Sequence, residues 1–217
     1  MNSRAQWKLP VLLLAIALAG LQPALAFEYP LSSDTIREAY FLGKSSAEKR
    51  AAFLAKYRRD LPAPATGPDI SVVEIQTPFS VVVTRASSAI SDYFAPDAEE
   101  EFLGKPGVFR VHVEIDLTAS YGWQIVGKDG GIRSRPDDFW RDFKIQLTQK
   151  GEEIPSQRVD GQPIYDSGED EGTWLAGATV EIEYDPAKID SATPATVDVF
   201  TPDGQDVQTT FDLAELR

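Results

Sequence analysis

The sequence has 217 residues, a formal net charge of −13 at pH 7, no cysteine and a single histidine. The excess of carboxylates disfavours nucleic acid as a partner, because proteins bind nucleic acid largely by neutralising its phosphates with Lys and Arg. The absence of cysteine excludes disulfides, thiol catalysis and cysteine-ligated metal sites.

Residues 1–26 have the order of features that is typical of a secretory signal peptide. Arg4 and Lys8 precede the apolar run "VLLLAIALAGL", and small residues end at Ala26. This order predicts cleavage before Phe27 and export to a bacterial periplasm or to the medium. An uncleaved anchor is the alternative, but the run is shorter than the about 20 residues of a membrane helix. We therefore expect no membrane span in the mature chain.

Residues 27–60 are predicted to form a helical hairpin. A Ser/Asp cap opens the first helix in "SSDTIREAYFLGK", and Gly43 is expected to end it. Ser45 and Glu48 match a capping box at the start of a second helix that runs to about Asp60. Residues 61–68 contain three prolines and one glycine, which predicts a stiff linker and a domain boundary.

Residues 69–217 are predicted to form an immunoglobulin-like antiparallel β-sandwich. This range contains several short segments in which apolar residues alternate with polar ones or in which β-branched and aromatic residues predominate. Turn residues separate most of these segments, as in a β-sandwich. The segment "TPDGQ" is expected to close a hairpin between the last two strands. One helix is predicted in "APDAEEEFLGKPG", with Pro96 in its first turn. The predicted strands are "ISVVEIQT", "FSVVVTR", "VFRVHVEIDL", "GWQIVG", "DFKIQLTQ", "ATVEIEY", "TVDVF" and "DVQTTFDL".

His112 is the first candidate for a chemical site, in the strand "FRVHVEIDL". Alternate residues of a strand share a face, so His112 and Glu114 lie on the same side and are a geometrically possible half of a metal site, which needs at least one further ligand from a neighbouring strand. The competing interpretation is a solvated strand face, because the same polar alternation recurs at Glu181 and Glu183. We favour the solvated face and expect no cofactor.

The acidic stretch "YDSGEDEGTW" is a second candidate, for calcium. Hard cations bind oxygen ligands in loops that contain glycine. The spacing of the acids does not match a calcium-binding loop, so a solvated acidic loop is the better prediction.

The third candidate is an aromatic and arginine-rich loop that can present rings and donors to a protein or a glycan. Trp123 is expected in the core, whereas Trp140 is expected to be exposed, because it lies out of phase with Phe143, Ile145 and Leu147. The competing interpretation is that the rings pack the sandwich. The residues proposed to bind are Tyr121, Arg133, Arg135 and Trp140.

The motifs of the common hydrolases and nucleotide-binding enzymes are absent from the sequence. The leading hypothesis is therefore a non-enzymatic binding or structural module of the bacterial envelope, with an unknown envelope protein or glycan as partner. The alternative hypothesis is a metal-dependent hydrolase or metal-binding protein that uses His112 and Glu114.

Overall fold

The computed structural model describes residues 27–89, 92–126, 130–168 and 172–217. The predicted signal peptide and residues 169–171 of the acidic stretch lie outside the described residues. Within those ranges the protein is mainly β, with antiparallel sheets and four α-helices. No helix in the described part of the chain is long and apolar enough to cross a membrane.

The large sheet consists of five antiparallel strands in the order β1-β2-β3-β9-β8. On its central strand, β3 (Phe109–Asp116), Val111, Val113 and Ile115 are fully buried, and the residues between them are half-buried. The predicted alternation of this strand is confirmed, so one face of the sheet covers the core and the other is polar. The remaining strands are β1 (Arg58–Asp60), β2 (Asp69–Gln76), β8 (Ser156–Gly168) and β9 (Gly172–Tyr184).

The small sheet consists of four antiparallel strands in the order β11-β10-β6-β7. Its apolar side chains share one hydrophobic core with the large sheet, in which Leu147 and Val199 pack with Val113 and Val180. The predicted hairpin between the last two strands is confirmed. The strands are β6 (Lys144–Gln149), β7 (Glu152–Ile154), β10 (Ala195–Phe200) and β11 (Asp206–Phe211), and β4 (Gln124–Val126) pairs with β5 (Ile132–Ser134) in a separate ribbon.

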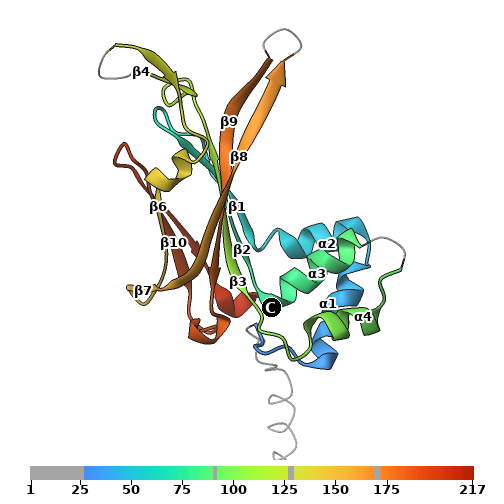
Figure 1. Ribbon diagram of the computed structural model, residues 1–217. Coiled ribbons are helices and arrows are strands. Elements are labelled where there is room, and N and C mark those ends of the chain that lie inside the picture. Colours follow the sequence, from blue (N-terminus) through green and yellow to red (C-terminus); the bar gives the residue numbers. More distant parts are fainter. Residues whose placement is uncertain (1–26, 90–91, 127–129, 169–171) are drawn as a thin grey trace, which may run out of the picture.

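The four helices lie together beside the lower part of the large sheet (Figure 1). They enclose a second, smaller core that includes Ile36, Tyr40, Phe79 and Val83. The described part of the chain also contains three short 3₁₀ helices. The bounds are α1 (Ser33–Gly43), α2 (Ala47–Leu54), α3 (Pro78–Ser88), α4 (Ala95–Phe102), η1 (Phe139–Asp142), η2 (Pro186–Lys188) and η3 (Leu213–Glu215).

The predicted N-terminal helices are found, and the second differs from its prediction at both ends. Helix α1 begins after its cap Ser32 and ends at Gly43, as expected. Helix α2 has Ser46 rather than Ser45 as its N-cap and ends at Leu54. The prediction that this helix runs to Asp60 is wrong, because Arg58–Asp60 instead pair with β2 at the edge of the large sheet.

The segment "FSVVVTR" was predicted as a strand, and this prediction is wrong. It forms α3, in which Pro78 occupies the first turn and the Thr77 side chain accepts a hydrogen bond from the Ser80 backbone N–H at 3.2 Å. These two features favour a helix start. Val82, Val83 and Ala86 are fully buried in the helical core, so tertiary packing outweighs the strand preference of the valines.

Residues 61–68, predicted as a linker, are held at their end by hydrogen bonds to the loop that follows β3 and to the turn between β10 and β11. The Gly67 N–H donates to Ser120 Oγ at 2.8 Å, and its carbonyl accepts from Thr118 Oγ1 at 2.6 Å. Gln205 Nε2 donates to the Thr66 carbonyl at 3.0 Å. The end of this segment is therefore fixed to the fold, whereas residues 62, 63, 65 and 66 are exposed.

Tyr57 and Arg217 join the helices to the large sheet. The fully buried Tyr57 hydroxyl donates to the Arg217 carbonyl at 2.9 Å and accepts from the Arg217 backbone N–H at 3.0 Å. The Arg217 guanidinium forms an ion pair with Glu38 of α1 and lies 4.8 Å from the ring centre of Phe79 in α3. Burial raises the pKa of Tyr57, so this hydroxyl keeps its proton.

Two carboxylates face each other where β2 begins and β3 ends. Asp69 and Asp116 are partners in the register of the two strands. Asp69 Oδ1 is buried and has no hydrogen-bond partner among the described residues. Burial, and secondarily the charge of Asp116, raise the pKa of Asp69. The ionised form of Asp69 therefore destabilises the fold.

Replacing Asp69 with asparagine is expected to stabilise the protein at pH 7. The raised pKa means that the stabilising contribution of Asp69 is complete in acid and is lost as the pH rises through its folded pKa. The Asp69→Asn variant lacks this loss and should gain about 1 kcal/mol, or roughly 2 to 4 °C in Tm. The gain should vanish below the ordinary aspartate pKa of 3.8. Thermal melts at a series of pH values measure the gain in Tm, with the exposed Glu152→Gln as the control variant. Equal gains in Tm at pH 3 and pH 7 would contradict the prediction.

Candidate functional site

Trp140 is buried, and the prediction that it is exposed and Trp123 is buried is wrong. Trp140 is 9% exposed, whereas Trp123 is 40% exposed. Residues 139–142 form the short helix η1, so the alternation of a strand does not apply to them. The Trp140 ring packs flat against β8, where a Cβ added to Gly161 would lie 2.3 Å from Trp140 Cε2. Only glycine leaves room for the ring at this position.

Two of the other predicted binding residues form a contact within the loop. The Arg135 guanidinium lies 3.7 Å from the ring centre of Tyr121, and Arg135 Nε donates to the Gly122 carbonyl at 2.9 Å. Arg133 lies elsewhere, exposed on β5 of the ribbon, where its register partner is Ile125. The structure thus brings Tyr121 and Arg135 together to brace the loop and places Arg133 on the ribbon.

A groove lies beneath η1, between the edge of the large sheet and the first half of β6. It has a volume of about 270 Å³. Its floor consists of apolar side chains from both sheets, and Val159 of β8 is 51% exposed at its side. The residues that line it are Trp140, Arg141, Phe143, Lys144, Ile145, Val159, Val180 and Ile182.

The groove is open because the chain changes sheets there. Strand β7 pairs with β6 only at Leu147–Gln149, and after Pro155 the chain joins the large sheet as β8. Residues 144–146 of β6 therefore pair with β10 alone, and β8 pairs with β9 alone, among the described strands. Each of these two segments presents one unpaired backbone edge, and such edges are templates for an added strand.

The groove carries two basic side chains in an acidic protein. Arg141 lies 5.0 Å from the ring centre of Trp140 and forms an ion pair with Asp138 at 3.5 Å. Lys144 lies 5.8 Å from the ring centre of Phe200. The net charge of the whole chain is −13, so these cations make the groove locally favourable to anionic groups.

Sequence reasoning missed most of this groove because it missed β8. The segment "SQRVDGQPIYDSG" contains two glycines and a proline and was not recognised as a strand. The one sequence feature that fits an edge strand is Pro163. Proline is tolerated at a sheet edge, because its missing backbone N–H removes no hydrogen bond between strands there. Of the proposed binding residues, only Trp140 lines the groove, with its buried ring.

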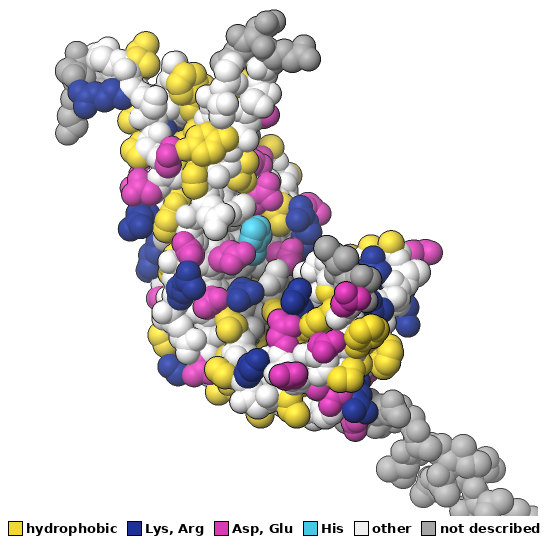
Figure 2. Space-filling view, turned by 45° about the vertical axis from the view of Figure 1, so that its right-hand side comes forward, with side chains coloured by type: hydrophobic (Ala, Val, Ile, Leu, Met, Phe, Trp, Pro, Cys, Tyr) yellow, Lys and Arg dark blue, Asp and Glu magenta, His cyan; other side chains and the backbone are white. Residues whose placement is uncertain are grey.

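His112 lies on the polar face of the large sheet, among carboxylates and cations (Figure 2). Its register partners are Glu74 on β2 and Glu181 on β9, and His112 Nδ1 is 3.8 Å from Glu181 Oε1. Glu114 has Val72 and Thr179 as its register partners. In the described ranges, no three His, Cys, Asp or Glu side chains are grouped so that they could hold a metal ion.

The ribbon and the β8–β9 hairpin project from the upper end of the sheets as two arms (Figure 1). The ribbon exposes Val126 and its register partner Ile132, which are 77% and 69% exposed. Figure 2 shows apolar side chains on both arms. A hydrogen bond to Asp137 raises the pKa of Tyr165 of β8, so this bond connects the hairpin with the segment that follows the ribbon.

A comparison with models of protein families gives no match to this sequence, and a comparison with curated proteins gives none either.

The packing of Trp140 on Gly161 predicts that Gly161→Ala destabilises the protein. The added methyl group overlaps the indole and must displace it, at a cost of about 1 to 3 kcal/mol. Chemical denaturation measures the loss, and tryptophan emission should shift to the red as Trp140 meets water. Gly122→Ala is the matched control, because its Cβ would meet its nearest neighbour at 3.5 Å. Equal stability of the two variants would show that the ring does not need the glycine.

Proposed function

We propose that this protein is an exported, non-enzymatic binding module that takes up an extended segment of a partner protein as an additional β-strand in the groove. In this proposal the two sheets form an immunoglobulin-like sandwich with one open side. The order of charged, apolar and small residues in residues 1–26 supports export to the bacterial periplasm or beyond.

One observation carries the proposal: an apolar groove is flanked by two strand edges that have no partner among the described strands. An added strand hydrogen-bonds through its backbone to a sheet edge, and its alternate side chains enter pockets. Strand β8 offers the backbone edge, and Phe143, Val180 and Ile182 offer an apolar floor for alternate side chains. A glycan is the poorer ligand for this floor, because sugars require polar groups that fix their hydroxyls.

The lower half of β8 is the segment that an added strand would use. Pro163 lacks a backbone N–H and so interrupts the hydrogen-bonding edge above Gln162. Below it, residues 156–162 run beside the groove, where Val159 is a lining residue. Arg141 and Lys144 at the groove favour a segment in which acidic residues alternate with apolar ones.

Synthetic peptides test this function directly. A peptide that alternates valine with glutamate should bind the purified protein at least about tenfold more tightly than one that alternates valine with lysine. The same valine–glutamate peptide with N-methylated backbone amides should not bind, because it cannot donate the hydrogen bonds of an added strand. Isothermal titration calorimetry gives the three affinities. Equal binding of the methylated peptide would contradict strand addition.

Charge reversal in the groove should reverse the peptide preference. Lys144→Glu is expected to weaken the valine–glutamate peptide and strengthen the valine–lysine peptide, whereas the exposed Lys188→Glu should change neither. Val159→Asp should abolish binding by placing a charge at the side of the apolar groove. Val126→Asp is its matched control on the ribbon. Loss of binding in the ribbon variant alone would move the site from the groove to the arms.

A further inference from the structure

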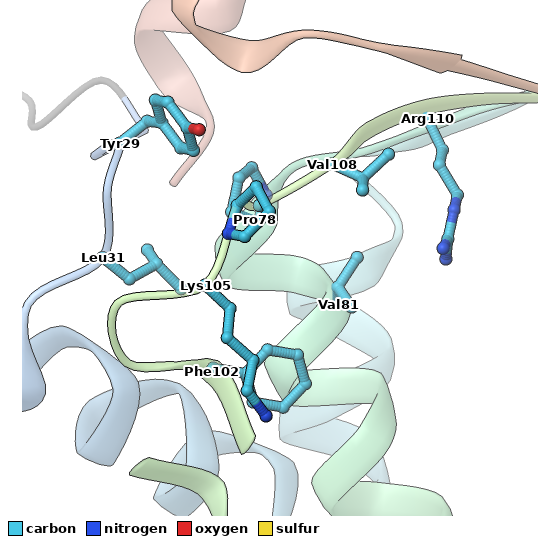
Figure 3. A pocket seen from close by; sticks show the side chains of 10 residues that line it. Tyr29, Leu31, Pro78, Val81, Phe102, Lys105, Val108 and Arg110 are labelled. Carbon is cyan, nitrogen blue, oxygen red and sulfur yellow. The ribbon is translucent and has the colours of Figure 1, made fainter. Parts of the chain in front are cut away.

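A second, separate pocket lies where the helices meet the large sheet. It has a volume of about 130 Å³ and is enclosed by three stretches of chain that are distant in sequence. Figure 3 shows Leu31, Pro78, Val81 and Phe102 around it. The complete lining is Tyr29, Leu31, Pro78, Val81, Phe102, Lys105, Pro106, Gly107, Val108 and Arg110.

The size and lining of this pocket indicate which apolar group, here called the body of the ligand, would fit inside it. Six of its lining side chains are aliphatic or aromatic apolar groups or prolines, from Leu31, Pro78, Val81, Phe102, Pro106 and Val108. An apolar cavity of about 150 Å³ holds a molecule the size of benzene. The pocket therefore fits an apolar group of about six carbon atoms.

Two cations at the pocket define the head group. Lys105 is exposed, and its ammonium group forms no ion pair with any residue that the structure describes. Arg110 donates through Nε to Glu183 Oε1 at 3.1 Å, and its terminal nitrogens have no acceptor among the described residues. A guanidinium has five N–H donors, so Arg110 retains donors for a second anion. In Figure 3 the Arg110 and Lys105 side chains lie on different sides of Val81.

We infer that this pocket binds a small organic carboxylate, with an aliphatic or single-ring body in the apolar pocket and the carboxylate at Lys105, and with Arg110 as a second, more distant positive charge. The apolar lining supplies affinity through the removal of apolar surface from water. The cations supply selectivity for an anion in a chain whose net charge is otherwise strongly negative. This site differs in place and in ligand class from the groove between the sheets, and neither proposal depends on the other.

Ligands that share one body and differ in charge test the inference. Hexanoate, hexanol and hexylammonium are titrated into purified protein and followed by ligand-observed NMR and calorimetry. Hexanoate is expected to bind most tightly, hexanol more weakly, and hexylammonium weakest of all. Equal affinities for hexanoate and hexylammonium, or no binding of hexanoate, would overturn the inference.

Variants of the pocket locate the bound hexanoate. Lys105→Gln should raise the Kd about two- to fivefold, as loss of a partly exposed ion pair does, and the exposed Lys49→Gln is its matched control. Val81→Phe should fill the pocket and abolish binding. Gly107→Ala is a milder block, because its methyl group would meet Pro78 at 3.1 Å and Tyr29 at 3.2 Å. Undiminished binding in Gly107→Ala and in folded Val81→Phe would place hexanoate elsewhere and overturn the inference.

Two further experiments distinguish this pocket from the groove between the sheets and from a binding site for a protein C-terminus. The groove variant Lys144→Glu should leave hexanoate binding unchanged, so failure of one proposal is distinguishable from failure of the other. A short peptide that ends in leucine carries the same chemistry at its C-terminus. If that peptide binds more tightly than hexanoate and its amidated form does not bind, the pocket recognises a protein terminus, and the small-molecule inference is wrong.

Discussion

The hydrophobic core that the two sheets share is the constraint on which the fold depends. The chain has no cysteine, so no disulfide limits the unfolded state and burial of apolar surface must stabilise the fold. Val113, Val180, Leu147 and Val199 meet in this core. Each strand that contributes to it must therefore present alternate apolar residues to one face, which leaves its other face free for polar groups.

The same core explains why the groove exists. To cover both sides of the core, the chain crosses from the small sheet to the large sheet at Pro155. Residues 144–146 of β6 then pair with β10 on one side and have no partner among the described strands on the other. Exposed strand edges favour association, and proteins limit this with prolines and charged residues. Pro163 has that character on β8, above the segment that runs beside the groove. The part of the edge beside the groove remains usable, in keeping with uptake of a strand.

The sequence correctly predicted those helices, strands and turns in which the local residue pattern and the tertiary packing favour the same conformation. The alternation of residues 109–117, the hairpin at residues 201–205 and the caps of α1 all have a local physical cause, and the structure contains each of them. Predictions failed where tertiary packing outweighed a local preference. The valines of α3 prefer strands but are buried between helices, and Trp140 lies in a helical turn against Gly161.

The sequence by itself determined the charge, the lack of disulfides and the period-two pattern that places His112 on a polar strand face. The tertiary structure alone decided which strands are neighbours, and so gave His112 its partners Glu74 and Glu181 and left β8 at an edge. It also assembled both proposed binding sites from distant segments. The physical reason is that a residue pattern encodes which face of an element is buried, whereas strand order and register depend on packing of the whole chain.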